Sequence, residues 1–197
     1  MSDIFFTSDL HLNHNKGFIY EPRGFSNCHE HSLGVIDNIN QVVKEDDELY
    51  ILGDVMLEDD EKGLYYFNRI KCHNIHIILG NHDSDKRIEI FKSLDNVKEL
   101  CFATRIKLKK WTFYLSHYPA NTCNDADKKN SAIVFNLCGH THTKDRFIEM
   151  RRGTMSYHVE LDCHDNYPIS IQDIKQDIID FKNKKSIVVC NCKMLVD

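Results

Sequence analysis

The sequence predicts an α/β protein with two packed sheets and helices outside them. In the first half, short apolar runs typical of buried strands alternate with segments of helical periodicity. In the second half, strand-like runs follow one another with short links. A polar turn rich in Asp, Asn or His follows most of these strands. Because ligands of such sheets bind at the carboxyl ends of the strands, we expect the functional site at this edge.

Two patterns predict the elements of the first half. Residues 4–8 form an apolar, β-favouring run that Asp9 ends, and they predict a buried strand. Apolar residues three apart, such as Leu64, Phe67 and Ile70, predict amphipathic helices. The expected order is strand 4–8, a long polar loop over 10–34 with one helical turn, helix 31–44, strand 48–52, helix 60–70, strand 75–79 and helix 85–94. This order is typical of a mostly parallel sheet with right-handed crossovers.

The second half is expected to complete a single domain over residues 1–197. One domain is ordinary at this length, and the sequence has no internal repeat or Pro-rich linker. The expected strands are 101–109, 111–116, 133–138, 147–151 and 157–162. The core spans about residues 1–162, and a helix over 171–181 and a strand over 186–190 close the fold within 165–197.

The composition restricts the functional class. A net charge of -5 excludes the basic footprint of a duplex DNA binder. No apolar run approaches the ~18 residues that span a bilayer, and residues 1–6 lack the basic segment of a secretory signal. We therefore expect a cytoplasmic protein with no membrane partner, whose 8 cysteines are reduced. The 12 histidines are the unusual feature, because imidazole binds metal ions.

Five segments concentrate side chains that bind metal ions, and each follows a predicted strand. They are Asp9-Leu10-His11, Gly53-Asp54, Gly80-Asn81-His82-Asp83, Ser116-His117 and Gly139-His140-Thr141-His142. Residues two apart in an extended segment point to the same side, so the paired residues of the first and last segments can each reach one cluster. Two Asp, one Asn and four His exceed the needs of one ion and would suit two. The alternative is a set of ordinary loop turns, in which Asp and Gly are common.

In this order, the five segments resemble the motifs of the calcineurin-like metallophosphoesterase superfamily. The resemblance covers roughly residues 4–162. It implies a four-layer metallophosphoesterase sandwich, in which two mixed β-sheets pack together and are flanked by helices. It also implies a dinuclear metal-dependent phosphoesterase that hydrolyses a phosphate ester by attack of a metal-bridging hydroxide. Of the two divalent cations, manganese is expected first, with iron, zinc or nickel as alternatives.

The resemblance assigns a role to each residue of these motifs. The first ion would be held by Asp9, His11 and His142, and the second by Asn81, His117 and His140. Asp54 would bridge the two ions. His82 would protonate the leaving oxygen or stabilise the transition state, and Asp83 would orient His82.

Departures from the family patterns narrow the resemblance. Protein phosphatases of the superfamily carry an Arg after the second Gly-Asp, and none follows Gly53-Asp54. Lipid A pathway pyrophosphatases usually have Arg where His82 stands. Residues 5–14 are most similar to those of small bacterial and phage-encoded phosphoesterases, although Gly24 stands where that group usually has Pro.

The loop after the first strand holds the candidates for substrate contact. We expect His14 and Arg23 to touch the substrate phosphate, because a guanidinium can hold two phosphate oxygens. His31 is expected to be structural. The substrate would be a phosphodiester or a small-molecule phosphate. The alternatives are a nuclease acting on nucleic acid ends, against which the acidic charge weighs, and a catalytically silent scaffold, which the complete ligand set disfavours.

Overall fold

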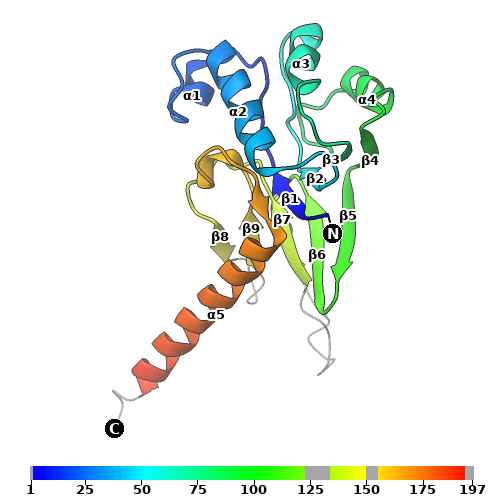
Figure 1. Cartoon of the computed structure of the whole chain (residues 1–197). Helices are drawn as coiled ribbons and strands as arrows, with labels where there is room; N and C mark the ends of the chain where they lie inside the picture. The colour runs from blue at the N-terminus through cyan, green and yellow to red at the C-terminus, as the bar shows by residue number, and fades with distance from the viewer. Residues whose placement is uncertain (1, 123–133, 150–154, 194–197) are drawn as a thin grey trace.

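The protein folds into two mixed five-stranded sheets that pack face to face (Figure 1). The structure is a computed structural model that describes residues 2–122, 134–149 and 155–193. The first sheet has the order β10-β1-β2-β3-β4, and the second has the order β5-β6-β7-β9-β8. In the first sheet β1 to β4 are parallel and β10 is antiparallel to β1. In the second, β6, β7 and β9 are parallel, and the edge strands β5 and β8 are antiparallel.

The bounds of the elements follow the chain. The strands of the first sheet are β1 (Ile4–Thr7), β2 (Glu48–Ile51), β3 (Asn74–Ile78), β4 (Val97–Cys101) and β10 (Ile169–Ser170). Those of the second are β5 (Ala103–Leu108), β6 (Trp111–Ser116), β7 (Val134–Cys138), β8 (Phe147–Glu149) and β9 (Met155–His158). The helices are α1 (Gly17–Tyr20), α2 (Cys28–Val42), α3 (Asp60–Phe67), α4 (Asp85–Lys92), the 3-10 turn η2 (Leu161–Cys163) and α5 (Ile171–Lys193).

Two hydrophobic clusters hold these layers together. Ile36 of α2 and Phe67 of α3 pack with Ile77 of β3 on one face of the first sheet. On the other face, buried residues of β1 and β3 pack with Phe113 and Leu137 of the second sheet. The first turns of α5 join this second cluster, and Figure 1 shows the rest of the helix leading away toward the C-terminus. The predicted fold class, two mixed sheets flanked by helices, is confirmed.

The chain changes sheet where one strand was expected. Instead of a single strand over 101–109, β4 belongs to the first sheet and β5 to the second. Phe102, between them, is 76% exposed. The apolar character of the sequence continues across this residue, so the pattern does not reveal the break. The expected start of β7 at Ile133 and the expected end of β8 at Arg151 lie outside the described residues.

Three further boundaries differ from expectation. The loop over 10–34 is shorter because α2 begins at Cys28, where the Asn27 side chain accepts a hydrogen bond from the Glu30 amide and caps the helix. The strand expected over 157–162 ends at His158, because the Cys163 amide closes a 3-10 turn onto the Glu160 carbonyl. The strand expected over 186–190 is wrong, since α5 continues to Lys193. A β-branched run favours a strand only when a sheet receives it, and an established helix propagates readily.

Candidate metal centre

The candidate ligands come from loops at the carboxyl ends of strands in both sheets. Asp9, Asp54 and Asn81 follow β1, β2 and β3, and His117 and His140 follow β6 and β7. Backbone hydrogen bonds continue between the first two loops: the Asp9 amide donates to the Gly53 carbonyl and the His11 amide to the Asp54 carbonyl, each at 3.0 Å. The parallel strands therefore bring these side chains to one edge, as the sequence predicts.

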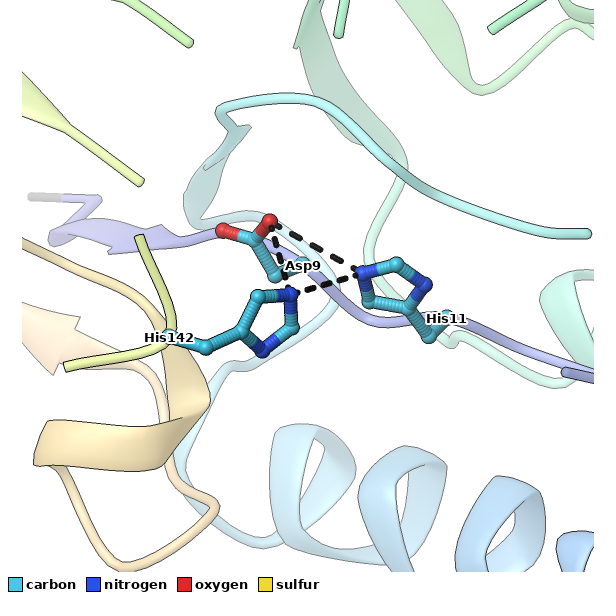
Figure 2. A group of neighbouring side chains, drawn as sticks. All are labelled: Asp9, His11 and His142. Atoms are coloured by element: carbon cyan, nitrogen blue, oxygen red, sulfur yellow. Dashed lines mark hydrogen bonds and ion pairs between the residues drawn. The ribbon is translucent and has the colours of Figure 1, made fainter. Parts of the chain in front are cut away.

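Asp9, His11 and His142 form the first group of candidate ligands (Figure 2). The Nε2 atoms of His11 and His142 lie 3.1 Å apart, and Asp9 Oδ1 lies 3.8 and 3.7 Å from them. Asp9 is fully buried, and Oδ1 has no hydrogen-bond partner among the described residues. A buried carboxylate oxygen without a partner is costly unless a cation completes the site. These residues fit a divalent cation.

The charge state of Asp9 supports this interpretation. Burial alone would raise the pKa of its carboxyl, but the His11 hydrogen bond and the charges of His117, His11 and His142 lower the pKa to about 2. Burial lowers the pKa of His11. An ionised carboxylate and a neutral imidazole are the forms that bind metal ions.

His117 is the centre of the second group. Its Nε2 atom lies 3.0 Å from Asn81 Oδ1, 3.2 Å from His140 Nδ1 and 3.6 Å from Asp54 Oδ2. Asp54 Oδ2 also lies 3.8 Å from His11 Nε2, so this oxygen faces both groups. Asp9 is close enough to belong to both groups as well. The structure thus brings all seven predicted ligands together.

Three of the histidines are held at the ring nitrogen that faces away from the cluster. His117 Nδ1 lies 2.7 Å from the Leu52 carbonyl oxygen, and His142 Nδ1 lies 3.0 Å from Asp162 Oδ2. His11 Nδ1 lies 3.1 Å from His14 Nδ1. An acceptor at Nδ1 keeps the hydrogen there and leaves Nε2 free for a metal ion. The sequence analysis assigned no role to Leu52 or Asp162.

The ligand loops share a strained backbone. Asp9, His11, Asp54, His140 and His142 all have positive φ, between 48° and 76°. An L-residue in this region costs roughly 1–2 kcal/mol. Such strain persists where the surrounding structure enforces it, and it gathers here at the candidate ligands.

Three glycines leave room for the ligands. Gly53 has a φ of 90°, and a Cβ there would lie 2.5 Å from His117 Nδ1. A Cβ on Gly80 would collide with the Asp54 carboxylate, and one on Gly139 with Ser8 and the Asp9 carboxylate. We expected these glycines to permit tight turns. Gly80 and Gly139 have no positive φ, so close approach to the carboxylates explains them instead.

A buried glutamate organises the loop after β7. Glu160 accepts hydrogen bonds from the backbone amides of Thr141 and Thr143, at 3.2 and 2.7 Å, and from the Thr141 hydroxyl at 3.1 Å. It is fully buried. This carboxylate therefore holds the segment that presents His140 and His142. No motif pointed to it, because its partners lie far away in the sequence.

His82 lies at the open side of the centre. Its side chain is 46% exposed, and Nε2 lies 3.9 Å from Asp54 Oδ2. The His82 amide donates to Asp54 Oδ1 at 3.0 Å, and Arg87 donates to the His82 carbonyl at 2.6 Å. The imidazole is thus near the candidate ligands and accessible to a substrate.

Asp83 has a different set of partners from the one expected. Its carboxylate accepts hydrogen bonds from the backbone amides of Gly80, Asp54 and Val55, at 2.8, 3.0 and 3.2 Å. Among the described residues, none of its hydrogen bonds involves the His82 imidazole. Asp83 therefore ties the loop after β3 to the loop after β2, and burial raises the pKa of its carboxyl.

The two residues expected to touch the substrate are both buried. His14 faces His11, and burial together with the charge of His11 lowers the pKa of His14 to about 4. The Arg23 side chain has no exposed surface and donates to both oxygens of Asp162. Arg23 also donates to Nε2 of His31, which is itself buried. Contact of His14 or Arg23 with a phosphate stays a prediction.

The described cysteines take no part in the centre. Five of them are free thiols: Cys28, Cys72, Cys101, Cys138 and Cys163. None belongs to the groups of candidate ligands found in the described part of the chain. Among the described residues, no helix combines the length and the apolar character needed to cross a membrane.

The chain is similar in sequence and in fold to known proteins. It is 37% identical over 84 residues to an uncharacterized protein of Methanocaldococcus jannaschii; the match covers 42% of the chain and 48% of that protein, so the chain spans about half the length of this relative. A protein of unknown function from Aquifex aeolicus has a similar structure, with a TM-score of 0.66 at 23% identity over 89% of this chain and 99% of that one. The E. coli phosphoesterase YfcE has a TM-score of 0.50 at 17% identity over 79% and 78%.

A family model identifies the chain more directly. Residues 3–158 match the Calcineurin-like phosphoesterase superfamily domain. This range contains all seven candidate ligands and His82. The chain therefore belongs to the calcineurin-like phosphoesterase superfamily and is a hydrolase of phosphate esters.

Proposed function

We propose that the protein is a dinuclear metal-dependent phosphoesterase acting on a phosphodiester or a small-molecule phosphate. The observation that carries the proposal is the position of Asp54 Oδ2, 3.8 Å from His11 Nε2 and 3.6 Å from His117 Nε2. A carboxylate oxygen between two groups of imidazoles suits a bridge between two cations. Asp9, His11 and His142 would hold the first ion, and Asn81, His117 and His140 the second.

The donor set favours borderline divalent cations. It consists of carboxylate, amide and imidazole groups without thiolate, which suits manganese first and iron, zinc or nickel as alternatives. Two carboxylates facing two divalent cations leave a net positive charge. Such a site favours a phosphate anion over a neutral substrate.

The chemistry divides between the ions and the side chains. When bound, the two cations supply positive charge for the phosphate and acidify the water that attacks phosphorus. Hydrolysis breaks the bond between phosphorus and the leaving oxygen, which needs a proton. His82, exposed and 3.9 Å from Asp54 Oδ2, is placed to donate this proton. Asp83 contributes by holding the loops that carry His82 and Asp54.

The substrate class rests on size and charge. The net charge of -5 gives a long nucleic acid little attraction, which favours small phosphate esters over the nuclease alternative. The complete ligand set and the accessible His82 weigh against a silent scaffold.

Hydrolysis of two aryl esters tests the proposal. The purified protein, loaded with Mn²⁺, is assayed on bis(p-nitrophenyl) phosphate and p-nitrophenyl phosphate, with Asp54→Asn as the site variant. Asp95→Asn, a change at an exposed position outside the centre, is the matched control. We expect turnover by the wild type and the control, and a loss of at least about 100-fold in Asp54→Asn. Full activity in Asp54→Asn, or hydrolysis of single-stranded oligonucleotides alone, would contradict the proposal.

A further inference from the structure

A buried ion pair lies directly behind His142. Arg23 Nη2 and Asp162 Oδ2 are 2.6 Å apart, and Arg23 Nε lies 3.2 Å from Asp162 Oδ1. The Arg23 side chain has no exposed surface, and that of Asp162 is 7% exposed. Asp162 Oδ2 also accepts from His142 Nδ1 at 3.0 Å. One carboxylate thus joins an arginine to a candidate metal ligand.

Separate parts of the chain form this arrangement. Arg23 lies between α1 and α2, His142 follows β7, and Asp162 lies in the 3-10 turn after β9. Arg23 is fixed at both ends: its Nη1 donates to His31 Nε2 at 3.1 Å, and its carbonyl oxygen accepts from Asn166 at 2.9 Å. A bidentate, fully buried pair of this kind has little freedom to move.

We propose that Asp162, held in place by Arg23, is the positioning residue for His142. The Asp162 carboxylate accepts the hydrogen on His142 Nδ1, and this turns Nε2 toward Asp9 Oδ1 and His11 Nε2. Arg23 acts through Asp162, by fixing the carboxylate and neutralising its charge. This inference rests on the proposed function, because it assigns His142 to the first metal ion.

The same geometry gives Arg23 a role other than phosphate binding. Its Nε and both terminal nitrogens already donate to Asp162 and His31. A phosphate at the open side of the centre would have to replace these buried partners. A positioning role and a substrate-binding role predict different measurements, since the first acts on metal affinity and the second on KM.

Calorimetric titration of the metal-free full chain with Mn²⁺ tests the inference. We expect two binding events in the wild type. In Asp162→Asn one of them should weaken by about 10–100-fold while the other is unchanged, as happens when the hydrogen-bond partner of a metal-ligating His is removed. Arg23→Lys should weaken the same event by less. Asp177→Asn, at an Asp–Arg ion pair outside the centre, is the matched control and should leave both events unchanged.

Kinetics at saturating Mn²⁺ provide the second measurement. Excess metal should restore kcat in Asp162→Asn and in Arg23→Lys, with KM close to that of the wild type. Thermal unfolding verifies that each variant folds, and Arg23→Lys serves if Asp162→Asn does not. Unchanged Mn²⁺ binding in a folded variant would overturn the inference, as would a raised KM in Arg23→Lys with wild-type Mn²⁺ binding. Failure of the wild type to bind two ions would instead overturn the proposed function.

Discussion

The Nδ1 atom of His117 lies 2.7 Å from the carbonyl oxygen of Leu52. Leu52 ends the strand that leads into Gly53 and Asp54, whereas His117 follows a strand of the other sheet. The loop after β2 therefore supplies one candidate ligand, Asp54, and the acceptor that orients another. This contact joins the two sheets at the metal centre.

Gly53→Ala should disrupt this contact. The new Cβ would meet His117 Nδ1 at 2.5 Å and the Gly80 backbone at 2.7 Å, in a residue whose φ of 90° already disfavours a side chain. We expect a loss of about 2–4 kcal/mol in the free energy of unfolding. Displacement of His117 should lower kcat/KM by on the order of 100-fold. Urea unfolding and the aryl ester assay measure the two effects.

Gly24→Ala is the matched control for this change. Its φ is 86°, but no atom lies within 4 Å of the added Cβ. Backbone strain alone should cost about 1 kcal/mol and leave activity intact. Equal effects of the two substitutions would show that the crowding at His117 has no part in the loss.

Asp83→Ala should destabilise the protein. The substitution removes the acceptor of three backbone amides, those of Gly80, Asp54 and Val55. Unsatisfied buried amides predict a loss of about 2–4 kcal/mol in the free energy of unfolding, and Asp83→Asn, which keeps one oxygen, should lose less. The exposed control Asp95→Asn should stay within about 0.5 kcal/mol of the wild type. Wild-type stability of Asp83→Ala would refute this role.

The parts of the centre that could be predicted follow from a local rule. Parallel strands end at one edge, so Asp9, Asp54 and Asn81 could be placed together from the strand pattern alone. Residues that support the ligands follow no such rule. Asp162 and Glu160 reach their partners only through tertiary structure, and Leu52 contributes a carbonyl oxygen, which every residue has.

The limits of the fold prediction have similar causes. Apolar patterning shows that residues near Phe102 are in strands, but it does not show which sheet they join, because that depends on distant partners. The two residues of β10 are too few for any periodicity. At the C-terminus, local preference for a strand at 186–190 was overridden by the helix that starts at Ile171.

Acid should destabilise the protein through His31. Burial and the charge of Arg23 lower the pKa of His31 from 6.5 to about 3. Between these values the unfolded chain binds a proton at this residue and the folded protein does not. The free energy of unfolding therefore falls as the pH falls below 6.5, by up to about 1.4 kcal/mol per pH unit for this one proton.

His31→Gln isolates the contribution of His31, because Gln keeps an acceptor for Arg23 and does not titrate. Urea unfolding of the metal-free proteins between about pH 7 and pH 4 provides the comparison. The variant should lose less stability than the wild type over this range. Parallel curves for the two proteins would exclude His31 as the group responsible.

His82→Ala should lower kcat without removing metal ions. His82 is exposed and lies outside the two groups of candidate ligands in the described structure. If its imidazole protonates the leaving oxygen, the loss should be about 100- to 10,000-fold for an alkyl phosphate and smaller for a p-nitrophenyl ester, whose leaving group needs no proton. The ratio of the two losses is the measurement. An equal loss for both esters would exclude His82 as the acid.

The central claim, that these loops hold two cations, is tested most directly by diffraction from crystals soaked in Mn²⁺. An anomalous difference map should show two peaks roughly 3.5–4 Å apart, with Asp54 between them. One peak should lie at Asp9, His11 and His142, and the other at Asn81, His117 and His140. A single peak, or peaks away from these side chains, would contradict the claim.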